Sequence, residues 1–180
     1  MEKRIAILAT DGFEQSELLS PKETLENEGW TAEVVSLKTG EIKSWKDGNW
    51  GDSVVVDRTV SEANASDYDA LVLPGGVINP DLLRVNEDAV AFVKAFFDEK
   101  KPVAAICHGP WTLINADVVS GREMTSYQSI RKDLENAGAI WTDAEVVVDQ
   151  GLVTSRSPQD LPAFNRKMVE EIKEGVHARM

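Results

Sequence analysis

The chain has 180 residues, enough for one domain with a real hydrophobic core, and a formal net charge of -12. So acidic a protein repels phosphates, which argues against binding to a nucleic-acid polymer, and no apolar run approaches the ~20 residues of a membrane span. One cysteine excludes an internal disulfide, and one cysteine with two histidines cannot form an ordinary structural zinc site. Because the N-terminus also lacks a signal-peptide pattern, we expect a cytoplasmic protein without a metal or another cofactor.

The first elements alternate between strand and helix. An apolar run over residues 4–9 predicts a strand buried on both faces, and the polar turn of residues 10–14 ends it. A Ser-Pro-Lys-Glu segment that begins at Ser20 is typical of a capping box with proline at the first helical position, so it predicts the start of a helix that ends at the next glycine. Residues 32–37 predict a second strand, and the polar, glycine-containing residues 38–53 predict a hairpin or a loop.

The middle of the chain repeats this alternation. Residues 70–73 predict a third buried strand, which a Pro-Gly-Gly turn stops. Apolar side chains at helical spacing predict a helix over residues 86–100. Residues 102–106 predict a fourth strand, which runs directly into Cys-His-Gly-Pro at 107–110, and a helix is expected to follow through residue 116.

The last elements are a helix, a strand pair and another helix. Residues 129–137 predict the first helix, and residues 145–148 and 152–155 predict two strands joined by a turn. A second capping box opens at Ser157 and predicts a C-terminal helix to about Glu174.

Strands that alternate with helices indicate an α/β fold with three layers and a mostly parallel central sheet. The active site of such a sheet lies beyond the carboxyl ends of its strands. Residues 11–14, 74–76 and 107–109 all follow predicted strands. We therefore expect these three segments to converge on one site.

Cys107 is the candidate nucleophile of this site. A lone cysteine at the end of a strand is often only a small buried hydrophobic residue. Here, however, the order of strand, tight turn and helix is typical of a nucleophile elbow, and a nearby helix N-terminus favours a thiolate. His108 follows at once. Because adjacent side chains of an extended segment point in opposite directions, it need not touch the thiol, and we expect it to shape the wall of the site or to act as a catalytic residue in proton transfer with the substrate.

Two further groups can act on the thiol or its substrate. Glu14 lies in the loop after the first strand, and if the strands are neighbours its carboxyl can reach Cys107 as a general acid-base partner. A solvated loop carboxyl is the alternative. Gly75 and Gly76 let backbone N–H groups approach a ligand, so the amides of Gly76 and His108 are candidate oxyanion donors; the alternative is a plain turn.

Five segments together resemble the PfpI family of the class I glutamine amidotransferase-like superfamily. They are DGFE at residues 11–14, LVLPGG at 71–76, AICHGP at 105–110, EVVVD at 145–149 and VTSRSPQDLP at 153–162. The resemblance covers essentially the whole chain and implies a single PfpI-type domain over residues 1–180 with a flavodoxin-like sandwich. It implies Cys107 as nucleophile, Glu14 as its hydrogen-bonded partner, and an enzyme that needs no cofactor.

The resemblance leaves three functions open. Family members include stress-response deglycases and glyoxalases that act on glyoxal or methylglyoxal adducts of proteins or nucleotides, and this is the function we expect. The second possibility is an intracellular cysteine peptidase. The third is a redox sensor or chaperone that works through oxidation of Cys107. Small carbonyl adducts or peptides would be the substrates, and neither a nucleic-acid polymer nor a membrane is expected as a partner.

The same resemblance implies a homo-oligomer, a dimer or a hexamer. In the family an acidic residue shortly after the Gly-Gly turn reaches the active-site histidine of a neighbouring subunit, and Asp81 stands at that position here; a surface or helix-capping residue is the alternative. Trp111 replaces the glutamine that family members often carry and predicts a smaller, more apolar pocket. Tyr127 and Arg156 complete the residues expected to bind substrate.

Overall fold

The computed structural model describes residues 2–175. His177, which we expect at the surface because its C-terminal segment is charged, lies outside the described residues. A seven-stranded sheet forms the centre, with the order β11-β12-β8-β7-β1-β3-β6. All its pairs are parallel except that of β11 with β12. Its strands are β1 (Arg4–Leu8), β3 (Thr31–Ser36), β6 (Arg58–Thr59), β7 (Ala70–Leu73), β8 (Val103–Ile106), β11 (Val147–Asp149) and β12 (Leu152–Ser155). The predicted α/β class and mostly parallel sheet are confirmed.

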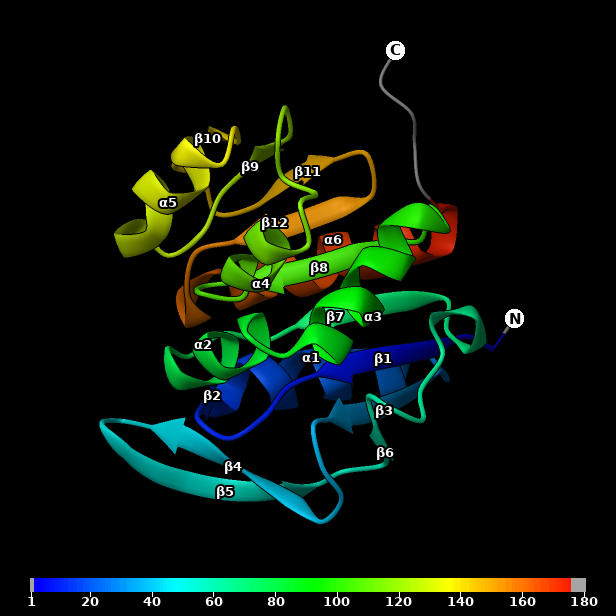
Figure 1. Cartoon of the computed structure of the whole chain (residues 1–180). Helices are drawn as coiled ribbons and strands as arrows, with labels where there is room; N and C mark the ends of the chain where they lie inside the picture. The colour runs from blue at the N-terminus through cyan, green and yellow to red at the C-terminus, as the bar shows by residue number, and fades with distance from the viewer. Residues whose placement is uncertain (1, 176–180) are drawn as a thin grey trace.

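Helices cover both faces of this sheet (Figure 1). On one face lie α1 (Gln15–Asn27) and α6 (Leu161–Glu174), and on the other lie α2 (Ile78–Arg84), α3 (Glu87–Asp98) and α4 (Pro110–Asn115). None of the described helices is long and apolar enough to cross a membrane. The three-layer arrangement predicted from the sequence is therefore present.

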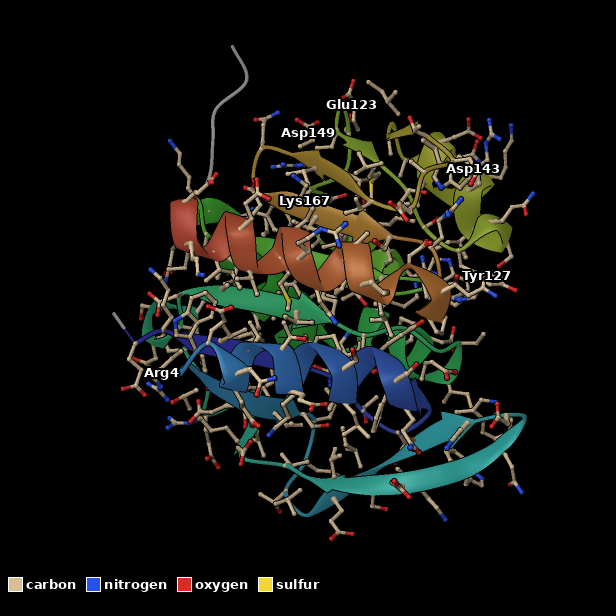
Figure 2. The ribbon with its side chains drawn as sticks, turned by 180° about the vertical axis from the view of Figure 1, so that it is seen from behind. Arg4, Glu123, Tyr127, Asp143, Asp149 and Lys167 are labelled. Carbon is tan, nitrogen blue, oxygen red and sulfur yellow. The ribbon has the colours of Figure 1, made fainter. Side chains whose placement is uncertain are left out.

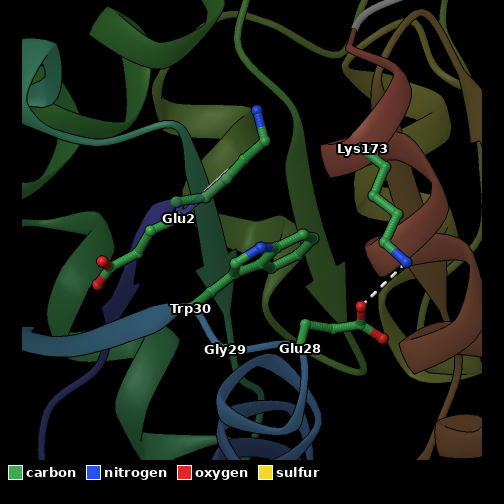
Figure 3. A pocket seen from close by; sticks show the side chains of 6 residues that line it. Glu2, Glu28, Gly29, Trp30 and Lys173 are labelled. Carbon is green, nitrogen blue, oxygen red and sulfur yellow. Dashed lines mark ion pairs between the residues drawn. The ribbon is translucent and has the colours of Figure 1, made fainter.

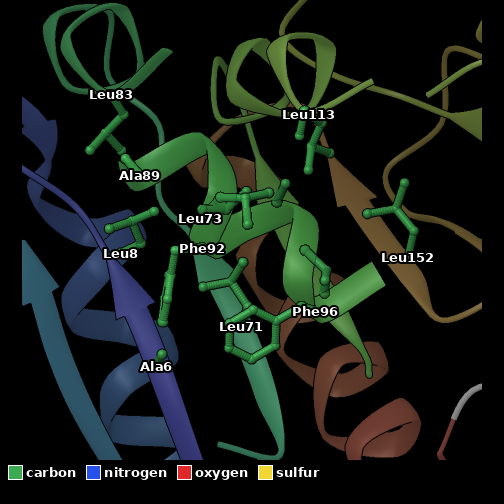
Figure 4. Packing of buried hydrophobic residues seen from close by; sticks show 14 of the residues in the cluster. Ala6, Leu8, Leu71, Leu73, Leu83, Ala89, Phe92, Phe96, Leu113 and Leu152 are labelled. Carbon is green, nitrogen blue, oxygen red and sulfur yellow. The ribbon is translucent and has the colours of Figure 1, made fainter. Parts of the chain in front are cut away.

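Successive residues of β1 enter different cores because side chains alternate across a strand. Ala6 and Leu8 belong to the core under α3, where Phe92 and Phe96 pack edge to face with ring centroids 5.1 Å apart (Figure 4). Ile5 and Ile7 belong to the core under α1 and α6. Burial on both faces explains why the strand has no polar alternation in its sequence.

Smaller elements surround the sheet. The predicted hairpin forms from β4 (Glu41–Lys46) and β5 (Asn49–Val55), and β4 also pairs with the short β2 (Phe13–Glu14). A separate flap contains β9 (Glu123–Met124), the 3₁₀ turn η2 (Gln128–Ile130), α5 (Arg131–Asn136) and β10 (Ile140–Trp141). Two more 3₁₀ turns, η1 (Ala65–Asp67) and η3 (Pro158–Asp160), precede β7 and α6.

The predicted start of the first helix is wrong. The helix begins at Gln15, and Pro21 lies inside it instead of at its first turn. Ser20 lies inside this helix and is not its cap. Its hydroxyl instead accepts a hydrogen bond from Asn165 of α6 at 2.9 Å. The capping box at Ser157 is also wrong: this side chain makes no cap bond, and η3 intervenes before α6. Packing between helices thus overrides the local capping signal.

Candidate active site

The carboxyl ends of three adjacent strands meet as the sequence predicts. The strand β7 lies between β1 and β8, so the turn at Gly75 separates the loop after β1 from Cys107. In Figure 2 Tyr127 marks this end of the sheet and Arg4 marks the opposite end. A pocket of about 580 Å³ at the opposite end, seen in Figure 3, contains the ion pair between Lys173 and Glu28 at 2.9 Å and no residue of the Cys107 cluster.

Cys107 sits in a strained turn directly after β8. Its φ of 62° lies in the left-handed region that non-glycine residues seldom occupy. The turn is held because the Cys107 amide donates to Ser155 at 3.0 Å and its carbonyl accepts from the Tyr127 amide at 2.9 Å. Such a conformation, held by neighbours on both sides, is typical of a nucleophile elbow.

Two backbone amides point at the sulfur. The N–H groups of Gly76 and His108 both hydrogen-bond the Cys107 thiol and act to lower its pKa. These are the two amides that the sequence singled out as oxyanion donors. Gly76 has a φ of 80°, and a Cβ there would lie 2.3 Å from the carbonyl oxygen of Gly12, so only glycine fits this close approach.

The carboxyl beside the thiol belongs to Glu17, not to Glu14. Glu17 lies in the first turn of α1, is fully buried, and accepts the Gly75 amide on Oε1 at 2.9 Å. A Cβ at Gly75 would lie 2.5 Å from this oxygen and 2.6 Å from Cβ of Cys107, so the bare glycine lets the two side chains meet across β7. The hydrogen-bonding position predicted for Glu14 is therefore wrong, because Glu14 caps α1 and pairs with β4, and the carboxyl that reaches the thiol comes three residues later, inside α1.

Glu14 itself faces the hairpin. It is the N-cap of α1, pairs with Trp45 in the small sheet, and donates its amide to Gly75 at 3.2 Å. Partial burial, with a smaller contribution from Asp47, raises the pKa of its carboxyl. Its charge reaches the thiol only as the weakest of the influences on Cys107.

Burial controls the protonation of the pair. Desolvation and then the charge of Glu14 raise the pKa of Glu17 to about 8, although hydrogen bonds from Gly75 and Cys107 oppose the change. Burial and then the Glu17 carboxylate raise the pKa of Cys107 well above its usual range. The thiol is only 7% exposed. Burial thus opposes the thiolate that the sequence led us to expect. At neutral pH both Glu17 and Cys107 hold their protons.

His108 touches the thiol, a contact that the sequence had left open. Its Nδ1 lies 3.2 Å from Sγ of Cys107. The predicted alternation fails because Cys107 is in a left-handed turn, not in an extended strand. The ring stacks on Tyr127 with centroids 4.8 Å apart and meets the edge of Trp111 at 5.2 Å. Burial lowers the pKa of His108, which favours a neutral imidazole.

The remaining predicted residues border the site. Trp111 does turn its ring toward His108, and its Nε1 donates to Asp133 at 2.9 Å. Tyr127 and Arg156 line a pocket of about 600 Å³, but Arg156 is already paired with Asp143 at 2.8 Å and with Asp160 at 2.9 Å. Substrate binding by these residues stays a prediction.

Asp81 lies apart from these side chains, exposed in the first turn of α2. Its contact with a second subunit stays a prediction. Among residues 2–175, no group of three or more His, Cys, Asp or Glu side chains is arranged to hold a metal ion.

The model of the DJ-1/PfpI family matches residues 3–171. The chain belongs to this family. It is 48% identical over 173 residues to a Bacillus subtilis protein named "Putative cysteine protease YraA", with 96% of this chain and all of that protein covered. It is also 48% identical to general stress protein 18 of Bacillus subtilis and 46% identical to protein/nucleic acid deglycase 2 of Escherichia coli, each over 93% of this chain and 96% of the relative.

Solved structures of the DJ-1/PfpI family share the fold. Drosophila melanogaster DJ-1beta superposes with a TM-score of 0.86 at 28% identity, covering 96% of this chain and 91% of that one. A two-domain Anabaena variabilis protein with DJ-1/ThiJ/PfpI-like and ferritin-like domains gives a TM-score of 0.90 at 37% identity. The match covers 95% of this chain but only 48% of that longer protein.

Proposed function

We propose that this protein is a cysteine-dependent hydrolase that removes glyoxal- or methylglyoxal-derived adducts from amines of proteins or nucleotides. One observation carries the proposal: the Cys107 thiol meets two backbone amides and the buried carboxyl of Glu17 at one point. Deglycase names among relatives at 45% to 48% identity support this substrate class. The general stress protein among the relatives supports a role in the stress response.

The first step is displacement of the amine. His108, through Nδ1 at 3.2 Å, takes the thiol proton, and Sγ attacks the carbinol carbon of the adduct. The C–S bond forms, the C–N bond breaks, and the leaving amine takes the proton from His108. A hemithioacetal on Cys107 remains.

The second step is a proton transfer by Glu17. A carboxyl with a pKa of about 8 can both accept and donate a proton near neutral pH. Glu17 moves the hydrogen of the sulfur-bound carbon to the adjacent carbonyl carbon. The proton of the hydroxyl on the sulfur-bound carbon passes to the carbonyl oxygen. The amides of Gly76 and His108 stabilise the negative oxygen, and each such donor is worth about 3 kcal/mol in acyl transfer.

Water completes the cycle. The second step leaves a thioester of lactate, or of glycolate from glyoxal, on Cys107. Water attacks this thioester, the C–S bond breaks, and the thiol recovers its proton. The pocket beside Tyr127 is the place where the remainder of a modified peptide or nucleotide would lie.

Turnover of three substrates tests the proposal. Methylglyoxal, a methylglyoxal-modified peptide and casein are each incubated with the purified protein and with the Cys107→Ser variant. Lactate from the first two, lost in the variant, is the expected result. Free methylglyoxal must be removed from the modified peptide first, because its consumption in solution imitates repair. Lactate formation that survives in the variant would refute the proposal.

A peptidase is the second candidate, and the contact between His108 and the thiol favours it. A histidine within hydrogen-bond reach of a cysteine is the arrangement by which cysteine peptidases activate their nucleophile. Cleavage of casein that depends on Cys107, without lactate formation, would select this function. Absence of any turnover would favour the redox sensor.

A further inference from the structure

We infer that Ser129 is a positioning residue that fixes the ring of His108 from within the same chain, so that Nδ1 faces the thiol. This inference rests on the proposed function, in which His108 takes the thiol proton. It goes beyond that function because it names the group that holds the histidine. Neither Ser129 nor the turn that carries it was singled out in the sequence.

The geometry places one partner on each ring nitrogen. Nδ1 of His108 lies 3.2 Å from Sγ of Cys107, and Nε2 lies 3.2 Å from Oγ of Ser129. A neutral imidazole carries one N–H, so the bond at one nitrogen decides the role of the other. When Nε2–H donates to the Ser129 hydroxyl, Nδ1 keeps its lone pair for the thiol proton.

Both contacts persist after the proton moves. The imidazolium donates from Nδ1 to the thiolate and from Nε2 to the hydroxyl oxygen of Ser129, so no group has to rotate. The turn η2 that carries Ser129 is tied to the elbow, since the Tyr127 amide donates to the Cys107 carbonyl at 2.9 Å and Ile130 donates back to the Tyr127 carbonyl at 3.2 Å. Serine and histidine are therefore held by two backbone segments that are hydrogen-bonded to each other.

Among residues 2–175, no other charged side chain is in contact with the ring of His108. The ring of Tyr127 covers one face and the edge of Trp111 packs against it. Arg84 of α2 and Asp133 of α5 both reach Trp111, one above its ring and the other at Nε1. Glu17 lies on the far side of the cluster, against Gly75 and the thiol. Ser129 is thus the polar group that meets Nε2.

The test measures the pKa of His108 as well as the turnover. The chain contains two histidines, so nitrogen NMR of the imidazoles assigns His108 by comparison with a His177→Gln variant. We expect Ser129→Ala to lower the pKa of His108, because the imidazolium loses an acceptor. We also expect it to lower kcat about fivefold, the worth of one ordinary hydrogen bond, with little change in KM. Ser129→Thr, which keeps the hydroxyl, should restore both values.

Two control variants test whether a change in the titration of His108 is specific to Ser129. Ser53→Ala removes an exposed hydroxyl on the hairpin and should leave the titration of His108 unchanged. An unchanged titration in Ser129→Ala would overturn the inference. A change in Asp81→Ala instead would assign the role to the carboxylate of a second copy. Because the titration needs no substrate, it remains decisive even if the proposed function fails in the Cys107→Ser comparison.

Discussion

Replacement of Glu17 by glutamine removes the ionisable carboxyl and keeps a side chain of nearly the same size and shape. Glutamine can keep the acceptor for the Gly75 amide at the place of Oε1, while the proton that Glu17 moves is lost. We expect turnover to fall by a factor of about 10² to 10⁴, the usual contribution of a general acid-base. The thiol of Cys107 should titrate at lower pH in the variant, because the Glu17 carboxylate raises its pKa.

The effect on stability follows from the raised pKa of the buried carboxyl. Below 4.5 both the folded and the unfolded chain hold the proton, so Glu17 contributes no pH dependence. Between 4.5 and about 8 the unfolded chain ionises while the folded one stays protonated. The free energy of unfolding then falls by about 1.4 kcal/mol per pH unit, which gives about 3 kcal/mol at pH 7. Above about 8 the loss levels off.

Urea unfolding of wild type and Glu17→Gln from pH 4.5 to 8 measures this difference. The variant should gain stability relative to wild type as the pH rises, whatever constant cost its amide carries. Glu14→Gln is the matched control and should show a much smaller change, because Glu14 is only partly buried. Parallel stability curves for wild type and Glu17→Gln would mean that Glu17 is ionised in the folded protein at neutral pH, and would contradict a raised pKa of this carboxyl.

Three further predictions concern the same site. Gly75→Ala should abolish turnover and lower the melting temperature by several degrees, because its Cβ would collide with Glu17 and Cys107. The same change at Gly40, where nothing lies within 4 Å but a φ of 102° strains any side chain, should also lower the melting temperature and yet leave turnover intact. Mild peroxide should add oxygen to Cys107, the sole cysteine, faster as the pH rises because the pKa of the thiol is raised; peptide mass spectrometry that finds oxygen only on methionines would contradict this. Mixing Asp81→Ala with Cys107→Ala subunits should restore part of the activity if Asp81 serves a neighbouring subunit, whereas sedimentation showing only monomers would rule this out.

The strand ends could be predicted because their signals are local. Buried apolar runs and the glycine turns that stop them identified β1, β7 and β8, and the order of alternation gave the parallel sheet. Cys107 and the amides of Gly76 and His108 followed from this frame. The structure brings all three together at one point, and their catalytic roles stay predictions.

Glu17 escaped prediction for a physical reason. The capping signal at Ser20 predicted a helix that starts after Glu17, whereas the helix begins at Gln15 and turns Glu17 inward. The position of β7 between β1 and β8 was also hidden, since strand order depends on packing across the whole sheet. One signal in the sequence could have identified this carboxyl. Glu17 follows Glu14 by three residues, and an acidic residue in the first turn of a helix after a strand lies at the end of the sheet where the site is expected.

The contact between His108 and the thiol depends on a single dihedral angle. An extended Cys107 would send the two side chains apart, and only its φ of 62° brings Nδ1 to the sulfur. The elbow pattern predicted a tight turn at Cys107, but not the direction in which such a turn sends the next side chain. Ser129 was missed for a different reason, because it meets His108 across 21 residues of chain.

Trapping the intermediate on Cys107 tests the central claim most directly. The protein is mixed with methylglyoxal-modified peptide freed of methylglyoxal, quenched in acid within the first turnovers, and digested for mass spectrometry. We expect a transient lactoyl mass on the peptide that contains Cys107, decaying as lactate appears, and neither signal in Cys107→Ser. Lactate released at an undiminished rate by Cys107→Ser, with no adduct on the wild-type cysteine, would contradict it.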